Sequence, residues 1–393
     1  MGSGSSSARA DSHSVNADAA SSDAGSSKNG WDKGKHKARG PELKGWLGSF
    51  PIGPGSSSGT ARLHLAADKA VLQVQYAAQT RGVPGKDQDR YAMHVPSGGK
   101  HGLALGIFDG HSVHGVGGGR THAASAATHL PAALMRAISK TARTVTAASG
   151  PQTSHAACVS SQRTLMKEDE PLVTAVNAEF SALQSAIEQR YQKQVAVRLM
   201  AEKAKLEAEI GEEMLLDLPQ EGGTTATAVV IHPRGIFAAW VGDSRAVVGL
   251  RDPAPAAGEG RVATRVVRGL PLTHDHNLAD EREQTRLLAC GGKTGVGEMA
   301  RTHVFVRGAE GTLRVTRSLG DSPFHREKAV SSIPDVTFHP LSPSTSFLVI
   351  ASDGIWDLMD CDAVVSAVAD DLARPPTGDF ANAAAAACDA LIA

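Results

Sequence analysis

Cysteine is scarce in this chain. The 393 residues include four cysteines, at positions 158, 290, 361 and 388. They lie far apart, and no two of them form the C-x-x-C pair that is typical of zinc sites, so the sequence predicts neither a zinc site nor a disulfide framework. This cysteine usage indicates a reducing compartment, and we expect a cytoplasmic or nuclear protein.

Long hydrophobic runs are also lacking. No stretch reaches the roughly 18 consecutive apolar residues that a membrane-spanning helix needs. The N-terminal MGSGSSSARADS has no apolar core of the kind found in secretory signals. An excess of one charge is missing as well, because 40 basic and 41 acidic side chains give a formal net charge of −1. That balance gives no reason to expect nucleic acid as a partner.

Residues 1–60 are dominated by Ser, Gly, Ala, Asp and Lys and show almost no apolar periodicity. This composition predicts a disordered tail, followed by a folded domain over residues 61–393. The first residues fit the pattern M-G-x-x-x-[ST], so Gly2 is a candidate for myristoylation. The same pattern arises by chance in a Gly/Ser-rich segment. One acyl chain binds membranes only reversibly, so we expect weak peripheral association at most.

Apolar periodicity predicts the first ordered elements. Alternation at Leu72, Val74 and Tyr76 indicates a strand. Residues 121–140 indicate an Ala-rich helix in which Pro131 marks a kink or a boundary. A polar loop insertion is expected near residues 144–170. A long helix follows, with one apolar face formed by residues 176, 180, 183, 187 and 191.

The rest of the chain alternates less regularly between helix and strand. Residues 224–250 read as three short strands, broken at His232–Gly235 and at Gly242-Asp243. Residues 280–292 read as a short helix that ends in a glycine cap. Strands and helices come in blocks, which favours antiparallel sheets with helices packed outside them.

Three apolar runs end in an aspartate beside a glycine. Asp109 follows GIF, Asp243 follows AWVG and Asp353 follows FLVIAS. Three unrelated Asp-Gly turns would explain this pattern. A sheet rim at which carboxylates converge on a hard cation would explain it equally well, since Mg²⁺ and Mn²⁺ prefer oxygen ligands. The spacing alone leaves both interpretations open.

Eight motifs in order resemble the PPM family, the metal-dependent (type 2C) protein serine/threonine phosphatases. They cover residues 70–393 and are GKDQD (85–89), FDGHSVHG (108–115), GGTTATAVV (222–230), WVGDSRAVV (240–248), LTHDH (272–276) with Arg286, LRVTRSLGD (313–321), IPDV (333–336) and LVIASDGIWDLM (348–359).

The resemblance implies an α+β fold, a four-layer α-β-β-α sandwich of two antiparallel sheets flanked by helices. Residues 61–393 would be the phosphatase catalytic domain. The implied reaction is dephosphorylation of phosphoserine and phosphothreonine in proteins by a water that two Mg²⁺ or Mn²⁺ ions activate, with a weaker third ion in some members. Phosphoproteins are the implied partners, and we expect a monomer.

The resemblance also implies roles for single residues. Asp109 would bridge the two metal ions, and the backbone carbonyl of Gly110 would bind one of them. Asp353 would be a further ligand, and Asp243 would hold the weaker third ion together with Asp353. His111 would be the general acid that protonates the leaving oxygen.

Further positions would support this site. Asp357 stands where the family keeps a carboxylate near the metal shell. Arg317 and Asp321 would support the site from behind its ligands or shape a nearby flap. Asp89 would be a metal ligand, and Gln88 beside it replaces an acid that most of the family carries.

Two more positions depart from the family pattern. Pro84 occupies the place of the basic residue that grips the substrate phosphate, which leaves Lys86 and Arg81 as the nearest substitutes. The terminal Asp-Asn motif, with its metal ligand and its strands, does not occur before the chain ends in CDALIA. We therefore expect a C-terminally incomplete domain with little or no activity by itself. A catalytically silent pseudophosphatase that binds phosphoproteins as a scaffold is the alternative.

Overall fold

The computed structural model describes residues 56–64, 71–79, 88–96, 102–112, 118–141, 163–164, 169–208, 222–251, 267–291, 293–294, 303–305, 311–373 and 380–392. All of them belong to one compact unit, Lys44–Ala393.

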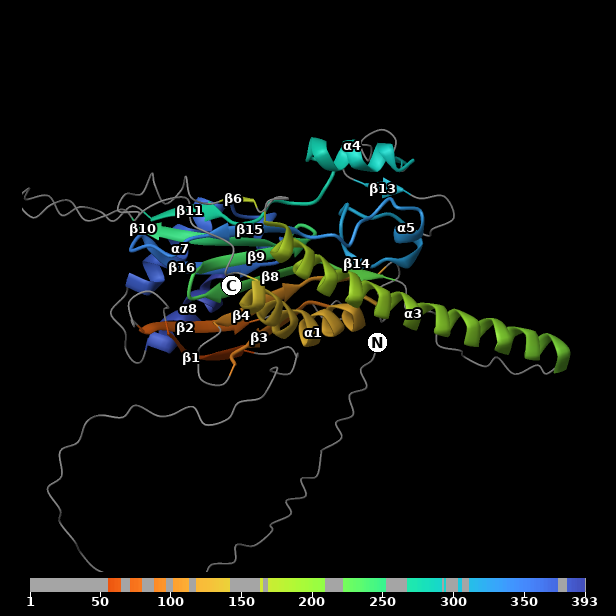
Figure 1. Cartoon of the computed structure of the whole chain (residues 1–393), viewed down its shortest axis with the longest axis horizontal. Coiled ribbons are helices and arrows are strands. Elements are labelled where there is room, and N and C mark those ends of the chain that lie inside the picture. The colour runs from red at the N-terminus through yellow and green to blue at the C-terminus, as the bar shows by residue number, and fades with distance from the viewer. Residues whose placement is uncertain are drawn as a thin grey trace, which may run out of the picture. The chain divides into compact units, whose positions relative to one another are not determined.

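A six-stranded antiparallel sheet forms the centre of this unit (Figure 1). Its strands, in spatial order, are β3 (Arg90–His94), β4 (Leu103–Phe108), β8 (Ala226–His232), β9 (Gly235–Val241), β15 (Asp335–His339) and β6 (Arg163–Thr164). The strands β8 and β9 are almost entirely buried, as their unbroken apolar sequences require. The predicted break between them, at residues 232–235, is confirmed.

A second antiparallel sheet packs against the first. It has the order β11 (Val267–Pro271), β10 (Arg245–Arg251) and β16 (Thr345–Ala351), and a hairpin of β1 (Ser56–His64) and β2 (Val71–Gln79) lies beside the sheets. Aliphatic side chains fill the space between the layers, including Val229 and Ile236 from the first sheet and Val248 and Leu250 from the second. The hairpin begins at Ser56, so the last residues of the predicted tail belong to a strand.

Helices cover the outer faces of both sheets. α1 (Gly118–Thr141) and α3 (Glu170–Ala208) pack on the six-stranded sheet, and α7 (Cys361–Ala373) and α8 (Phe380–Ile392) lie on the other side (Figure 1). The predicted four-layer α-β-β-α arrangement is thereby confirmed.

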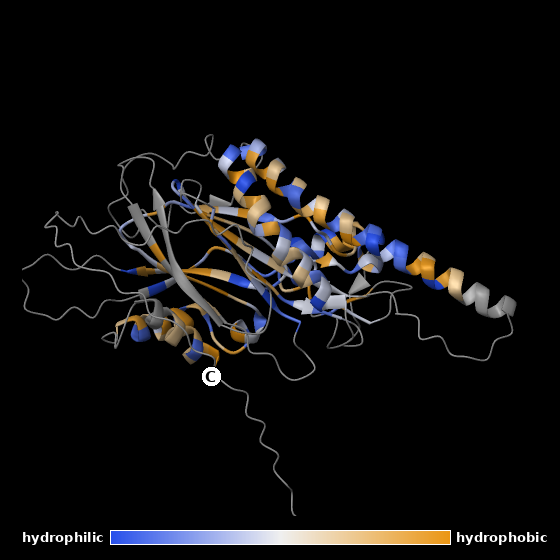
Figure 2. Cartoon of the chain, turned by 90° about the horizontal axis from the view of Figure 1, so that it is seen from below, coloured by the Kyte–Doolittle hydropathy of each residue, from blue (hydrophilic) through white to orange (hydrophobic). Residues whose placement is uncertain are grey.

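The two long helices follow their sequence patterns unequally. The predicted apolar face of α3 is buried, with Val176 and Phe180 both at 0% exposure, and Figure 2 shows its apolar residues among polar ones. α1 was expected to kink or end at Pro131; it does not end there but continues to Thr141. Leu130 and Leu134 on either side are buried in the core, and this packing holds the helix together although Pro131 lacks the N–H for one hydrogen bond.

Several short elements complete the described fold. They are β5 (Gly110–His111), β7 (Gly223–Thr224), β12 (Lys293–Thr294), β13 (Val304–Phe305), β14 (Leu319–Gly320), α4 (Glu281–Ala289), α5 (Ser322–Arg326) and α6 (Asp353–Trp356). Asp280 caps the N-terminus of α4 by accepting from the Arg282 N–H, and Gly291 follows its end with φ +78°. The predicted glycine-terminated helix is thus confirmed.

Some predictions concern residues outside the described ranges. They include most of the N-terminal tail with Gly2, most of the polar insertion near 144–170, and both candidate phosphate-binding residues, Arg81 and Lys86. Among the helices that are described, none combines the length and the apolar character needed to cross a membrane.

A pair of matched substitutions on α3 tests the packing. Leu183 is 7% exposed and Leu199 is 60% exposed. Leu183→Ala should lower the free energy of unfolding by about 2–5 kcal/mol, because it leaves a cavity under the helix. Leu199→Ala makes the same chemical change on the surface and should alter stability by less than about 0.5 kcal/mol. Denaturant unfolding monitored by circular dichroism measures both, and equal losses would contradict the packing of α3.

Candidate active site

Strand pairing brings four aspartates to one end of the sandwich. Asp89 directly precedes β3 and Asp109 directly follows β4, and the first residue of β3 pairs with the last residue of β4. In the second sheet, Asp243 lies before β10 and Asp353 after β16, and the first residue of β10 likewise pairs with the last of β16. The Ser352 hydroxyl donates to Asp89 Oδ2 over 3.1 Å and so joins the ends of the two sheets. The structure therefore favours the interpretation in which the aspartates gather at one rim of the sheets over that of three unrelated Asp-Gly turns.

The carboxylates of this acidic cluster, Asp89, Asp109, Asp243 and Asp353, repel one another. Burial and the nearby charges of Asp89, Asp353 and Asp243 hold the pKa of Asp109 well above its usual value. Burial also raises the pKa of Asp89, although hydrogen bonds from Asp109 and Ser352 oppose that shift. The pKa of Asp243 rises to about 6 because of burial and the charge of Asp353. Without a cation, the carboxyl groups with raised pKa stay protonated up to a higher pH than they would in water.

The backbone around Asp109 is firmly held. Its N–H donates to Thr225 Oγ1 (3.1 Å), and its carbonyl accepts from the Thr225 N–H (2.8 Å). Thr225 Oγ1 in turn shares a 2.8 Å hydrogen bond with the Ser244 hydroxyl. A Cβ on Gly110 would lie 2.6 Å from the Gly119 carbonyl oxygen, so only glycine fits beside Asp109. These contacts fix the direction in which the Asp109 carboxylate points.

The donor set suits a hard divalent cation. Its atoms are carboxylate oxygens whose negative charges repel one another, and Mg²⁺ or Mn²⁺ would neutralise this repulsion. Gln88 contributes a further oxygen: its Nε2 donates to Ser112 Oγ (3.3 Å), while its buried Oε1 finds no hydrogen-bond partner within the described residues. The oxygen donors therefore suit the metal that the resemblance implies, although no three of these carboxylates place ligand atoms within 4.8 Å of one another, and which atoms bind it stays a prediction.

His111 pairs with Asp321 at the edge of the acidic cluster. The distance between His111 Nε2 and Asp321 Oδ2 is 2.8 Å. Burial by itself would lower the pKa of His111, but the Asp321 carboxylate outweighs it and raises that pKa. Asp321 is buried too, and the His111 ring and the Ser318 hydroxyl nevertheless hold the pKa of its carboxyl below the usual value. Asp321 thus contacts the predicted general acid directly.

A small cleft of about 110 Å³ opens beside Asp243 and Asp353. Asp357 and Arg314 lie on its lining, where they form a 3.6 Å ion pair with both side chains more than half exposed. Arg245 also lines the cleft and makes a bidentate ion pair with Asp275, at 2.6 and 2.8 Å. Asp357 is therefore near the acidic cluster but is engaged by a cation of the protein itself.

Arg317 was expected to support the site from behind its ligands or to shape a nearby flap, and the structure shows which groups it binds. Its guanidinium binds Glu283 Oε1 (2.6 Å) and Asp335 Oδ1 (2.8 Å). Burial would lower the pKa of Arg317, but these two carboxylates raise it. Arg317 thus belongs to a second polar cluster, which also contains His274 and His276.

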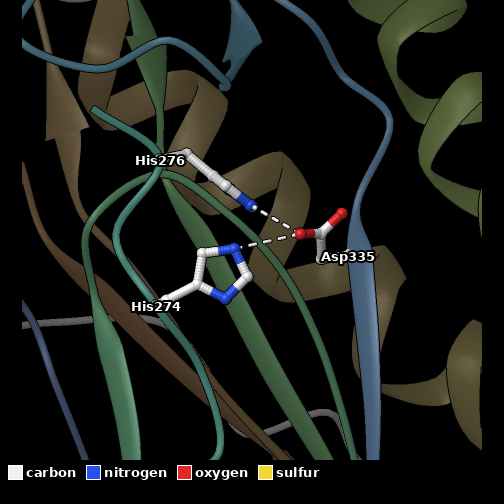
Figure 3. A group of neighbouring side chains, drawn as sticks. All are labelled: His274, His276 and Asp335. Carbon is white, nitrogen blue, oxygen red and sulfur yellow. Dashed lines mark ion pairs between the residues drawn. The ribbon is translucent and has the colours of Figure 1, made fainter. Parts of the chain in front are cut away.

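This second cluster resembles a metal site in its geometry (Figure 3). Among the described residues, His274, His276 and Asp335 form the one set of three such side chains whose ligand atoms all lie within 4.8 Å of one another. The neighbouring groups already satisfy it, however. Asp335 Oδ1 accepts from Arg317, and His274 Nε2 lies 2.7 Å from Arg282 Nη2.

The tautomer of His276 also argues against a metal there. The Gly242 N–H donates to His276 Nδ1 over 3.3 Å, which leaves the proton of the neutral ring on Nε2, 3.4 Å from Asp335 Oδ2. Although burial opposes it, bonding to His274, His276 and Arg317 keeps the pKa of Asp335 far below its usual range. The cluster is therefore neutralised by the protein itself. The His-x-His spacing of 274 and 276 was the sequence signal that could have revealed it.

Comparison with known proteins identifies the family. The family profile described as "Protein phosphatase 2C" matches residues 133–393, well over half of the chain. The chain belongs to the protein phosphatase 2C family. It is 35% identical over 153 residues to "Protein phosphatase 2C homolog 2" of Aspergillus flavus, which is 37% of this chain and 29% of that protein. It is also 35% identical over 159 residues to "Probable protein phosphatase 2C T23F11.1" of Caenorhabditis elegans, which is 39% of this chain and 38% of that one.

The fold has a counterpart among solved structures. The structure of a C. elegans sex-determining protein superposes with a TM-score of 0.50 at 19% identity and covers 86% of this chain and 61% of its own. At this identity the likeness concerns the fold. The matched segments span less than half of the curated relatives described above.

The raised pKa of Asp243 makes a signed prediction about stability. A carboxyl whose pKa is higher in the folded state stabilises the fold while it is protonated, and that contribution is lost as the pH rises from 3.8 to about 6. In metal-free buffer, Asp243→Asn should match the wild type below pH 3.8 and should be the more stable protein above about pH 6. Added Mg²⁺ or Mn²⁺ should narrow this gap by stabilising the wild type.

Chemical denaturation at several pH values measures the effect. Asp280→Asn is the matched control, because the bonding to Arg282 lowers the pKa of Asp280 and so reverses the sign of the pH effect on stability. At high pH the wild type should therefore be more stable than Asp280→Asn. A difference between Asp243→Asn and wild type that does not change with pH would contradict the charge repulsion in the acidic cluster.

Proposed function

We propose that this protein phosphatase 2C family member hydrolyses phosphoserine and phosphothreonine in proteins with the help of Mg²⁺ or Mn²⁺. The observation that carries the proposal is the gathering of Asp89, Asp109 and Asp353 from two sheets at one end of the sandwich, with His111 nearby. Family membership supports the reaction class, and the acidic cluster supports the dependence on a metal.

Each residue of the site has a task in this proposal. Asp89, Asp109 and Asp353 hold the ions together with the Gly110 carbonyl, and Asp243 adds charge for a weaker one. When bound, Mg²⁺ or Mn²⁺ lowers the pKa of a coordinated water and neutralises charge on the phosphoryl oxygens. The chain itself supplies the proton for the leaving serine or threonine oxygen, from His111.

The first experiment measures metal binding and turnover together. Wild-type protein should bind Mn²⁺ in titration calorimetry, and Asp109→Asn should abolish that binding, because it removes charge from the centre of the acidic cluster. Hydrolysis of a phosphoserine peptide should need Mn²⁺ or Mg²⁺ and stop in EDTA. Glu188→Gln, which removes an ion pair between α3 and Arg326, is the control for a carboxylate-to-amide substitution outside the acidic cluster and should leave Mn²⁺ binding intact.

Turnover of the phosphoserine peptide in this assay supports the phosphatase. Phosphopeptide binding without turnover would support the scaffold instead, for which the neutral Gln88 is the specific observation. Failure of the wild type to bind Mn²⁺ would overturn the metal-dependent mechanism.

A leaving-group comparison tests His111. His111→Ala should slow hydrolysis of a phosphoserine peptide by about 10²–10⁴-fold, the usual contribution of a general acid. An aryl phosphate has a leaving group that needs no proton, so its hydrolysis should change far less. Equal losses on both substrates would contradict the general-acid role.

A further inference from the structure

We infer that Asp321 is a positioning residue for His111: it holds ring nitrogen Nε2, so that Nδ1 is the nitrogen that gives the proton to the leaving oxygen. The inference rests on the proposed function for its chemistry, but the pairing itself is a property of the folded chain.

The contacts of Asp321 are those of a buried orienting group. Its Oδ2 lies 2.8 Å from His111 Nε2 and accepts from the Ser318 hydroxyl over 2.5 Å. The Asp321 side chain is 3% exposed, whereas that of His111 is 29% exposed. The carboxylate thus sits behind the ring, and the ring retains access to solvent. A histidine held in this way is fixed in both orientation and tautomer, as in hydrolases in which an aspartate orients a catalytic histidine.

The fold brings the two residues together across 210 positions of sequence. A three-stranded sheet of β14, β7 and β5 does this, with His111 opposite Gly223 and Gly223 opposite Gly320. A Cβ on Gly223 would lie 2.1 Å from Asp321 Oδ2, so glycine at this position makes room for the carboxylate.

The backbone of Asp321 is strained to reach this place. Its φ of +43° and ψ of +45° lie in the left-handed region, which L-residues other than glycine seldom adopt. Neighbouring contacts hold it there: its N–H donates to the Gly222 carbonyl (2.7 Å), and the Gln184 side chain bonds both the N–H and the carbonyl of Gly320. Strain that the surroundings enforce at a catalytic group favours a functional role for Asp321.

The proton transfer then has a defined course. A water oxygen forms the new P–O bond and releases one of its protons to solvent, and the old P–O bond breaks with its electron pair on the serine or threonine oxygen. That oxygen takes the Nδ1 proton of the His111 imidazolium. The neutral ring keeps its proton on Nε2, where it is hydrogen-bonded to Asp321, and Nδ1 regains a proton from solvent.

NMR spectroscopy of metal-free, ¹⁵N-histidine-labelled protein tests the pairing without any turnover. The His111 ring, assigned by the loss of its signals in His111→Gln, should show an Nε2-bound proton that exchanges slowly enough to be observed in water. Asp321→Asn should lose or move this signal. Asparagine tolerates the left-handed backbone, so the variant should fold. Asp280→Asn, at the N-cap of α4, is the matched control and should leave the signal unchanged.

Kinetics test the consequence. Asp321→Asn should lower kcat for a phosphoserine peptide by about 10–100-fold, a part of the roughly 10²–10⁴-fold that a general acid contributes, and should change aryl phosphate hydrolysis by less than about threefold. A purely structural role would lower both rates equally, and that result would overturn the positioning role. A protonated Nδ1 with a bare Nε2 in the neutral wild-type ring would overturn the pairing. If the wild type shows the Nε2 proton but has no phosphatase activity on any substrate, the pairing stands and the proposed function fails.

Discussion

Repulsion among Asp89, Asp109, Asp243 and Asp353 is the constraint on which the rest of the site depends. The fold must keep four carboxylates together against their mutual charge, and it does so through strand register and short backbone contacts. The Ser352 hydroxyl ties the ends of the two sheets together at Asp89. The proposed metal site thus gives up some stability to keep these carboxylates close together when no cation is bound.

The second polar cluster has the opposite character, because it neutralises itself. Arg317 lies between Glu283 and Asp335, and His276 shares Asp335. The His276 ring nitrogen Nδ1 also accepts from the Gly242 N–H, and the backbone N–H of His276 donates to the Gly242 carbonyl over 2.9 Å. Because Gly242 directly precedes Asp243, this cluster clamps the turn that carries one carboxylate of the acidic cluster. A cluster with the geometry of a metal site thus positions one carboxylate of the acidic cluster.

The three-stranded sheet of β5, β7 and β14 connects the acidic cluster with the pair of His111 and Asp321. Its strands are only two residues long, yet they place His111, Gly223 and Gly320, the residue before Asp321, side by side. The same short segment continues to Thr225, which holds the backbone of Asp109. The proposed metal ligands and the proposed proton donor are therefore supported by adjacent residues of a single strand-like stretch.

The sequence by itself determined the elements whose signals are local. Apolar runs and turn residues marked β8, β9 and β10, the buried face of α3 followed from its periodicity, and Asp280 and Gly291 delimited α4 as caps do. Aspartates beside glycines at strand ends indicated where the acidic cluster would form.

Only the tertiary structure decided the partners. Asp321 meets His111 and Arg317 meets Glu283 because strands far apart in sequence pair in one register, and α1 continues through Pro131 because core packing outweighs one missing hydrogen bond. Contacts of this kind depend on where distant strands come to lie, and no local pattern encodes that.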